Sequence, residues 1–283
     1  MTAVTAPGPD VGTGPVTQSR VIRAEWIKLR SLRSTGYSLL ATVVIVVALG
    51  TLFSALRAHR YNQDVANGTL RVGRHGAALV GFDPTLVSLR GVFLAQLAIG
   101  VLGVLVITGE YATGMIRSSL AAVPHRQPVL VAKALVFAAA AFAVSLASAF
   151  FAFLLGQQAL ASTHGQASLS TPGAWRAILG AAVYLTLIGT LGVGLGFLIR
   201  STAGAIATLF GIVLVLPLLA QALPSPYSTD VTKYLPLSAG TRILSVTHPD
   251  PTALGPWIGI GLTALYALAA LIAGAVALAR RDG

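Results

Sequence analysis

The chain has 283 residues, of which 55% are hydrophobic and only 10% are charged. Because soluble domains carry about 25% charged residues, this composition excludes an ordinary soluble domain. The net charge of +11 would suit a nucleic-acid binder, but the basic residues lie mostly at the ends of apolar runs, where they act as topology signals and lipid-headgroup anchors. We therefore expect the lipid bilayer, and no nucleic acid, as a partner. The absence of cysteine excludes disulfides, thiol catalysis and cysteine metal ligands.

The apolar runs predict an all-α integral membrane protein. Unpaired backbone groups are costly in lipid, so each run must be a helix or part of a closed barrel. The runs are about 20 residues long and do not alternate apolar with polar residues, which excludes the barrel. Residues 35–283 are therefore expected to form one domain with six transmembrane helices. The expected spans are residues 37–56, 86–108, 129–156, 174–199, 205–223 and 253–279.

Two segments are expected before the first span. Residues 1–19 are rich in Pro, Gly, Thr and Val without a helical period, which predicts a disordered cytoplasmic tail. In residues 20–34, Ile22, Trp26 and Leu29 recur at helical spacing, which predicts an interfacial amphipathic helix on the membrane surface. A stop-transfer flank of the first span is the simpler alternative. The basic and headgroup-level residues of this helix are Arg23, Trp26, Lys28, Arg30 and Arg33.

Five residues inside the expected spans have both a structural and a functional interpretation. Arg90 lies near the end of the second span, where snorkelling to the interface is favoured over a substrate or gating contact. Gly192, Gly194 and Gly196 predict close helix packing along the fourth span. Pro217 predicts a kink in the fifth, because proline lacks the N–H of one helical hydrogen bond.

Polar connections separate the spans. Residues 57–84 hold the turn signal Asn67-Gly68, and residues 200–204 make a tight hairpin between the fourth and fifth spans. The Pro-rich connection at residues 224–252 is expected either to dip into the outer interface or to form a plain surface loop.

Six spans place both termini on one side of the membrane. That side carries more Lys and Arg than the other, so the positive-inside rule predicts that both termini are cytoplasmic. The four arginines of the first outer connection are the chief evidence against this orientation.

A short polar segment, residues 109–117, separates the second span from the third. On a helix, Glu110, Gly114 and Arg117 fall at i, i+4 and i+7 and share one face. The helix is expected to continue until Pro124, roughly parallel to the membrane at the cytoplasmic face. An ordinary cytoplasmic connector is the alternative.

The sequence offers no catalytic, cofactor-binding or metal-binding motif. Each of the three lysines lacks the preceding glycine-rich loop that a phosphate-binding Walker A motif requires, so we expect no nucleotide on this chain. The five histidines are scattered singly, without the spacing of a zinc or hydrolase site. The expected spans hold no carboxylate, which disfavours a proton-coupled secondary carrier.

The order of these elements resembles the ABC-2 type transporter permeases, the membrane subunits of bacterial ATP-binding cassette exporters. The resemblance rests on RAEWIKLRS before the first span, on GEYATGMIRSSLAAVP after the second, and on RQPVLVAK leading into the third. It covers nearly the whole chain after residue 20 and is most specific at Glu110, Tyr111, Gly114 and Arg117.

The resemblance implies a half-transporter in the plasma membrane of a bacterium. Residues 20–34 would be the connecting helix, and the segment between the second and third spans would be the cytoplasmic coupling helix that docks on an ATPase. In that role, Glu110 and Arg117 would make polar contacts with the ATPase, Tyr111 would anchor the helix and Gly114 would allow close approach. The family also implies short extracellular helices between the fifth and sixth spans.

The resemblance further implies the partners. Two copies of the permease would work with two separate ATPase subunits, which would bind the ATP and Mg²⁺, and the chain itself would be no enzyme. The apolar spans favour a lipophilic or amphipathic cargo. The alternative function is a non-transporting membrane scaffold or sensor subunit that recruits a cytoplasmic partner.

Overall fold

The computed structural model describes residues 17–31, 33–68, 82–115, 126–225, 227–247 and 253–281. Within these residues the regular structure is entirely helical, and six helices are long and apolar enough to cross a membrane. The chain therefore has the architecture of an all-α, multi-pass membrane protein, as predicted. Most of the expected disordered tail lies outside the described residues, but its last two residues belong to α1 (Gln18–Ser31).

The first span is longer than predicted. Helix α2 (Arg33–Ala66) has 34 residues and is about 51 Å long, against about 30 Å for the hydrocarbon core. It continues past residue 56 because the next ten residues, though polar, contain neither glycine nor proline. It ends at the predicted turn, where Gly68 takes a positive φ of 70°. Helix α2 therefore projects beyond a membrane-thick layer.

The second span is divided in two. Helix α3 (Pro84–Ser88) is followed by a turn and then by α4 (Val92–Ala112), so the expected continuous helix over residues 86–108 is wrong. The turn lies against α2, where a methyl group on Gly91 would come within 2.4 Å of the Val46 carbonyl oxygen. Arg90 is exposed in this turn and does not lie within a helix.

The third and fourth spans agree with expectation in position. Helix α6 (Arg126–Ala159) begins three residues before its predicted span and ends three after it, with a 3-10 turn, η2 (Ala161–Thr163), behind it. Helix α7 (Ala174–Ile199) has the predicted bounds. Gly173 and Arg200 flank α7 with φ values of 92° and 62°, and these left-handed residues stop the helix at both ends.

The fifth span contains the predicted irregularity. It runs through α8 (Thr202–Phe210), the π-helical turn η3 (Gly211–Val215) and α9 (Leu216–Gln221). Pro217 has no N–H to donate to the carbonyl four residues earlier, which lies within the π turn. The proline thus explains why regular α-helical bonding is interrupted at this point.

The connection before the sixth span, α12 (Pro256–Arg281), is helical and packed. It forms α10 (Tyr227–Thr232), α11 (Pro236–Thr241) and the 3-10 turn η4 (Arg242–Leu244). A methyl group on Gly240 would come within 2.3 Å of the Tyr184 ring, and Ala239 is fully buried. Helix α11 is therefore pressed into the bundle and is not a plain surface loop.

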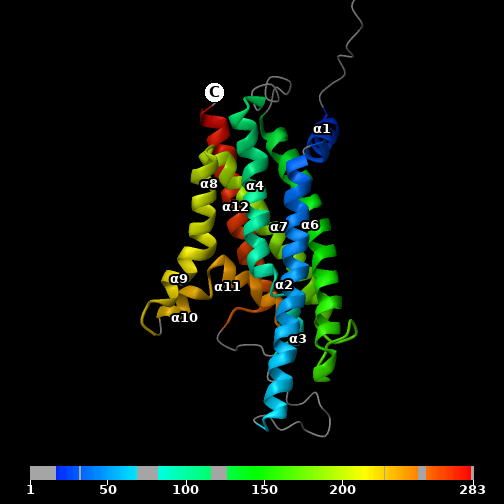
Figure 1. The fold of residues 1–283 in the computed structure, drawn as a ribbon. Coiled ribbons are helices and arrows are strands. Elements are labelled where there is room, and N and C mark those ends of the chain that lie inside the picture. Colours follow the sequence, from blue (N-terminus) through cyan, green and yellow to red (C-terminus); the bar gives the residue numbers. More distant parts are fainter. Residues whose placement is uncertain are drawn as a thin grey trace, which may run out of the picture.

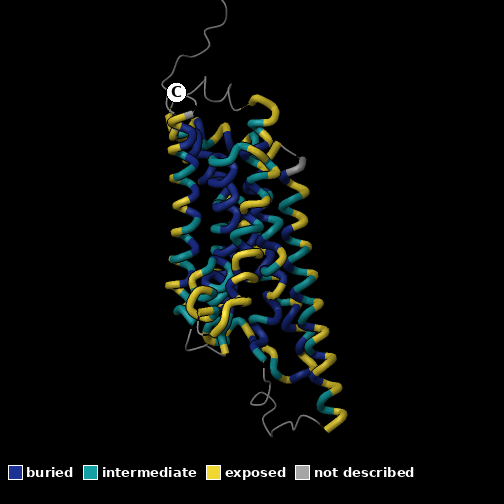
Figure 2. The backbone as a smooth tube through the Cα atoms, turned by 90° about the vertical axis from the view of Figure 1, so that its left-hand side faces the viewer, coloured by how far each residue is buried: buried dark blue, intermediate teal, exposed yellow. Residues whose placement is uncertain are grey.

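Helix α7 forms the centre of the bundle, where it packs against α4, α6 and α12. The predicted small-residue face allows this packing: methyl groups on Gly192 and Gly194 would overlap the backbone of α4 and α12. Figure 1 shows α1 and the last turns of α12 at one end of the bundle, and α10 and α11 toward the other; we call these the α1 end and the α11 end. Figure 2 shows buried residues along the inner helices and exposed residues on outward faces.

Candidate functional site

Four charged side chains meet at the α1 end, and we call them the ion cluster: Glu25 and Lys28 of α1, Glu110 of α4 and Lys133 of α6. The Lys133 ammonium donates to Glu25 Oε2 at 2.5 Å and to Glu110 Oε1 at 2.7 Å. Lys28 Nζ lies 3.0 Å from Glu25 Oε1 and 3.8 Å from Glu110 Oε1. With two acids and two bases, the cluster is formally neutral and joins three helices.

The cluster is buried unevenly. The Lys133 side chain is 3% exposed, Glu25 is 6% exposed and Glu110 is 12% exposed, whereas Lys28 is 32% exposed. Buried charges are tolerated only when they are paired and hydrogen-bonded, and removing one partner of such a pair is strongly destabilising. Lys133 is therefore the central residue of the cluster, and Lys28 closes it on the solvent side.

Local packing places α1 where it can make these contacts. The Gln18 side-chain amide donates to the Pro128 carbonyl oxygen at 3.1 Å, and Val21 packs against Val129 and Ala132 of α6. One helical turn after Val21, Glu25 faces the same way and reaches Lys133. The side of α1 that meets the bundle thus carries a valine and a glutamate.

The last turn of α4 is tied to the bundle on its other side as well. The Arg200 guanidinium lies over the Tyr111 ring at 5.2 Å and donates to the Ala277 carbonyl oxygen of α12 at 3.4 Å. The Thr202 hydroxyl donates to Thr108 Oγ1 at 3.0 Å. Glu110 therefore connects the end of α4 to α1 and α6, Tyr111 connects it through Arg200 to α7 and α12, and Thr108 connects it to α8. We call this arrangement the α4 junction.

The predicted helix does not continue from Glu110 through Gly114, and its expected course from residue 116 to Pro124 lies outside the described residues. Helix α4 ends at Ala112, and Gly114 takes a φ of 72° while its N–H donates to the Tyr111 carbonyl oxygen at 3.3 Å. Glycine adopts this left-handed conformation at little cost and ends helices in this way. Glu110 therefore belongs to the span helix, whereas Gly114 lies beyond its end. Arg117 lies outside the described residues.

The residues predicted for the interfacial helix divide into two groups. Arg23, Trp26 and Arg30 are exposed on α1, as residues facing lipid headgroups would be. Lys28 is drawn into the ion cluster instead. Arg33 begins α2, and its side chain is outside the described residues.

Sequence reasoning missed Glu25 and Lys133. Lys133 falls within the expected third span, residues 129–156, and lies within the apolar helix α6, where a charged residue is costly unless paired. Glu25 and Lys28, spaced i and i+3, gave a further signal of an ion pair. The apolar helices run past the predicted spans, so that α4 includes Glu110 and α2 includes Asp64 near their ends.

The α11 end is held by a buried carboxylate. Asp83 caps α3 by accepting from the Leu86 N–H at 3.0 Å, and its second oxygen accepts from the backbone N–H groups of Val246 and Thr247 at 2.5 and 3.0 Å. Both oxygens are thus used for structure. Among the described residues, no group of three His, Asp or Glu side chains is arranged to hold a metal ion.

Comparison with known proteins gave no assignment: no family model matches this chain, and no curated protein matches it.

Proposed function

We propose that the chain is the permease subunit of an ATP-binding cassette exporter and forms the path of a lipophilic or amphipathic cargo. The six apolar helices and the resemblance of the motifs before the first span and after the second support this proposal. Two copies of the chain would assemble with two separate ATPase subunits, which would bind the ATP and Mg²⁺.

The α4 junction is the observation that carries the proposal. A permease without its own nucleotide site needs a rigid connection between the surface that meets the ATPase and the helices that move. The segment after Ala112 leaves α4 directly beside Glu110 and Tyr111, and α6 begins where the chain returns at Arg126. Lys133 of α6 donates a hydrogen bond to Glu110 of α4, and this bond joins the two helices on either side of the segment.

The ion cluster would make α1, α4 and α6 respond together. A push on the segment between α4 and α6 would reach α1 through Glu110, Lys133 and Glu25, and α7 and α12 through Tyr111 and Arg200. Glu110 and Tyr111 would then transmit the movement from inside the permease, while the exposed Met115 would meet the ATPase. Gly114 would set the direction in which the segment leaves α4.

We further propose that the α1 end faces the cytoplasm of a bacterium. Over the full sequence, more Lys and Arg residues fall on the side of the α1 end than on the other side, and the positive-inside rule then favours this end as the cytoplasmic face. The described basic residues of the α1 end are Arg20, Arg23, Lys28, Arg30, Lys133, Arg200 and Arg280.

Site-specific crosslinking tests the proposal, because the chain has no cysteine and any introduced thiol is unique. The full chain is co-expressed with ATP-binding cassette ATPases of the same genome, beginning with any encoded beside it. A thiol-reactive photocrosslinker on Met115→Cys is expected to capture the ATPase. The matched control is Trp257→Cys, which is 70% exposed near the α11 end and is expected to capture none.

Activity of the complex completes the test. In liposomes, the co-purified complex is expected to hydrolyse ATP in a vanadate-sensitive manner, and an amphipathic cargo is expected to stimulate this hydrolysis. Capture of an ATPase without any cargo stimulation or ATP-dependent transport would favour the scaffold function instead. Absence of capture at Met115, or equal capture at both positions, would overturn the proposed coupling surface.

A further inference from the structure

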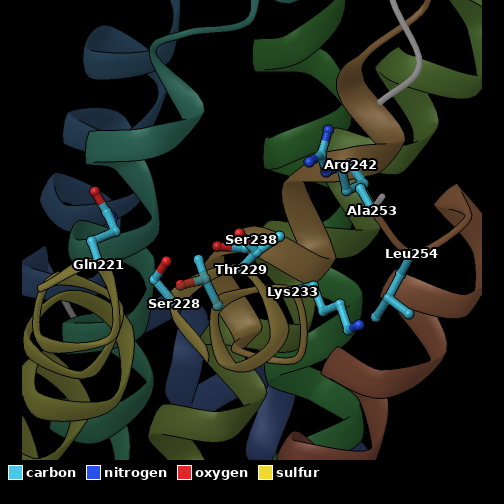
Figure 3. Close-up of a pocket in the computed structure, with 9 residues that line it drawn as sticks. Gln221, Ser228, Thr229, Lys233, Ser238, Arg242, Ala253 and Leu254 are labelled. Atoms are coloured by element: carbon cyan, nitrogen blue, oxygen red, sulfur yellow. The ribbon is translucent and has the colours of Figure 1, made fainter. Parts of the chain in front are cut away.

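A polar cavity of about 400 Å³ opens at the α11 end, far from the ion cluster. Figure 3 shows side chains from several segments around it: Gln221 ends α9, Ser228 and Thr229 belong to α10, and Ser238 belongs to α11. Thr232, Lys233 and Arg242 complete the polar lining, and Ala253 and Leu254 complete the wall before α12. Seven of the nine lining side chains are therefore hydroxyl, amide or cationic groups.

The lining suits an anion that carries several oxygens. Its hydroxyls and amide can donate to such a group, its two cations attract it, and none of the described lining residues is a carboxylate. Lys233 is also hydrogen-bonded to the exposed Asp230 at 2.7 Å. That hydrogen bond raises the pKa of Lys233, so its ammonium stays charged at neutral pH. With Asp230 included, the site keeps a net positive charge.

A second cavity, of about 450 Å³, adjoins the first and shares Ser238 and Arg242 with it. Its wall is partly apolar, with Phe82, Leu86 and Phe93. Its single described carboxylate, Asp83, already accepts backbone N–H groups with both oxygens and would repel an anion. The first cavity is therefore mainly polar without a carboxylate, whereas the second adds Phe82, Leu86 and Phe93 to a lining that also holds Thr241, Ser245 and the shared Ser238 and Arg242.

Large aromatic and aliphatic side chains lie exposed close in sequence to residues that line the first cavity. Tyr227 is 66% exposed, Trp257 is 70% exposed, and Leu218 on α9 is 67% exposed. Exposed Trp and Tyr side chains at the end of apolar helices mark the level of the lipid headgroups. A molecule resting in the bilayer would therefore meet the first cavity with its polar group.

We infer that the two cavities together form a binding site for an amphiphile with a phosphate or carboxylate headgroup. The headgroup lies in the first cavity beside Lys233 and Arg242, and the apolar part passes Ser238 toward Phe82, Leu86 and Phe93. This site does not depend on the transport function proposed above, because it needs neither an ATPase nor movement of the spans.

Tryptophan quenching in nanodiscs tests the site on the full chain without an ATPase. Trp26→Phe and Trp175→Phe leave one tryptophan, Trp257, three residues from the lining Leu254, as the reporter. Brominated phosphatidylglycerol, an anionic lipid, is expected to quench Trp257 saturably. Its apparent affinity is expected to be at least about tenfold higher than that of brominated phosphatidylcholine. Charge-assisted hydrogen bonds are worth about 1.5–3 kcal/mol, and 1.4 kcal/mol corresponds to a factor of ten in affinity.

Three variants separate the site from general surface charge. Lys233→Gln with Arg242→Gln is expected to abolish the preference for the anionic lipid. Ser228→Phe keeps both cations but fills the cavity, and is expected to abolish the preference as well. Arg90→Gln removes an exposed arginine that does not line either cavity and is expected to leave the preference unchanged. Helicity and monodispersity are checked for every variant.

Three outcomes would overturn the inference. Equal quenching by both lipids, or an equal loss in the Arg90→Gln variant, would mean that the cavity does not select a headgroup. Inorganic phosphate is added in a separate arm. If phosphate binds at the first cavity while the wild type shows no lipid preference, the cavity is a site for a free anion and not for an amphiphile.

Discussion

Removing the Lys133 ammonium is expected to be the most damaging single change at the α1 end. Lys133→Met keeps the length of the side chain but leaves Glu25 and Glu110 facing each other, with only the half-buried Lys28 to balance them. Lys133 donates two charge-assisted hydrogen bonds in the structure, each worth about 1.5–3 kcal/mol. Breaking a buried pair in other proteins costs about 3–5 kcal/mol. We therefore expect Lys133→Met to lower the free energy of unfolding by about 3–5 kcal/mol.

The matched control is Lys28→Met, which removes a lysine from the same cluster. Lys28 is 32% exposed and pairs with Glu25 only three residues away, so its loss is expected to cost about 1 kcal/mol or less. Reversible unfolding in mixed micelles measures both variants. Limited trypsin digestion gives a local readout, because α1 should detach in Lys133→Met and expose the bonds after Arg23 and Arg30.

A double-mutant cycle with Glu110→Gln tests whether the loss comes from the pair itself. In the Lys133→Met background, Glu110→Gln is expected to recover about 1 kcal/mol or more, because it removes one of the two unbalanced carboxylates. Equal costs for the two lysine variants, or a Lys133→Met change within about 0.5 kcal/mol of the wild type, would refute the reasoning.

Two further predictions concern packing and the α11 end. Gly103→Ala would bring a methyl group within 2.0 Å of the Gly189 carbonyl oxygen and should lower the free energy of unfolding by about 1–3 kcal/mol in the same assay. The control Gly261→Ala, with nothing within 4 Å, should be neutral or slightly stabilising. Equal effects of the two changes would contradict the close approach of α4 and α7. Asp83→Ala leaves the Val246 and Thr247 N–H groups without their acceptor, so hydrogen exchange at these amides should accelerate, and unchanged exchange would refute the capping role.

Local features of the sequence were enough to predict the number and approximate position of the spans. An apolar run of about 20 residues must satisfy its backbone internally in lipid, and this requirement alone makes each run a helix. The bounds of α7 were predicted correctly because glycine and arginine turns close it at both ends. The length of α2 was underestimated because the end of an apolar run is not the end of a helix: polar residues such as Asn62 and Gln63 continue it.

The charged residues of the candidate site were predicted only in part. Glu110 was identified because it interrupts two apolar runs, and Trp26 and Arg23 because they fit an amphipathic pattern. Lys133 resembled an ordinary flanking charge, since a lysine at the start of an apolar run has the same local sequence whether it faces water or a carboxylate. Gly114 was placed on a helix by its spacing, but glycine is also the residue that ends helices, and spacing does not distinguish the two.

The sequence by itself thus determined that the chain is a bundle of six apolar helices preceded by a basic amphipathic helix, because helix formation in lipid depends on neighbouring residues. Only the tertiary structure decided which charges meet. Lys133 lies 108 residues from Glu25 and 23 from Glu110, and its bonds to both exist because α1 folds back onto α6 while α4 ends beside them. Ion pairing depends on distances in space, and no local pattern in the chain records those distances.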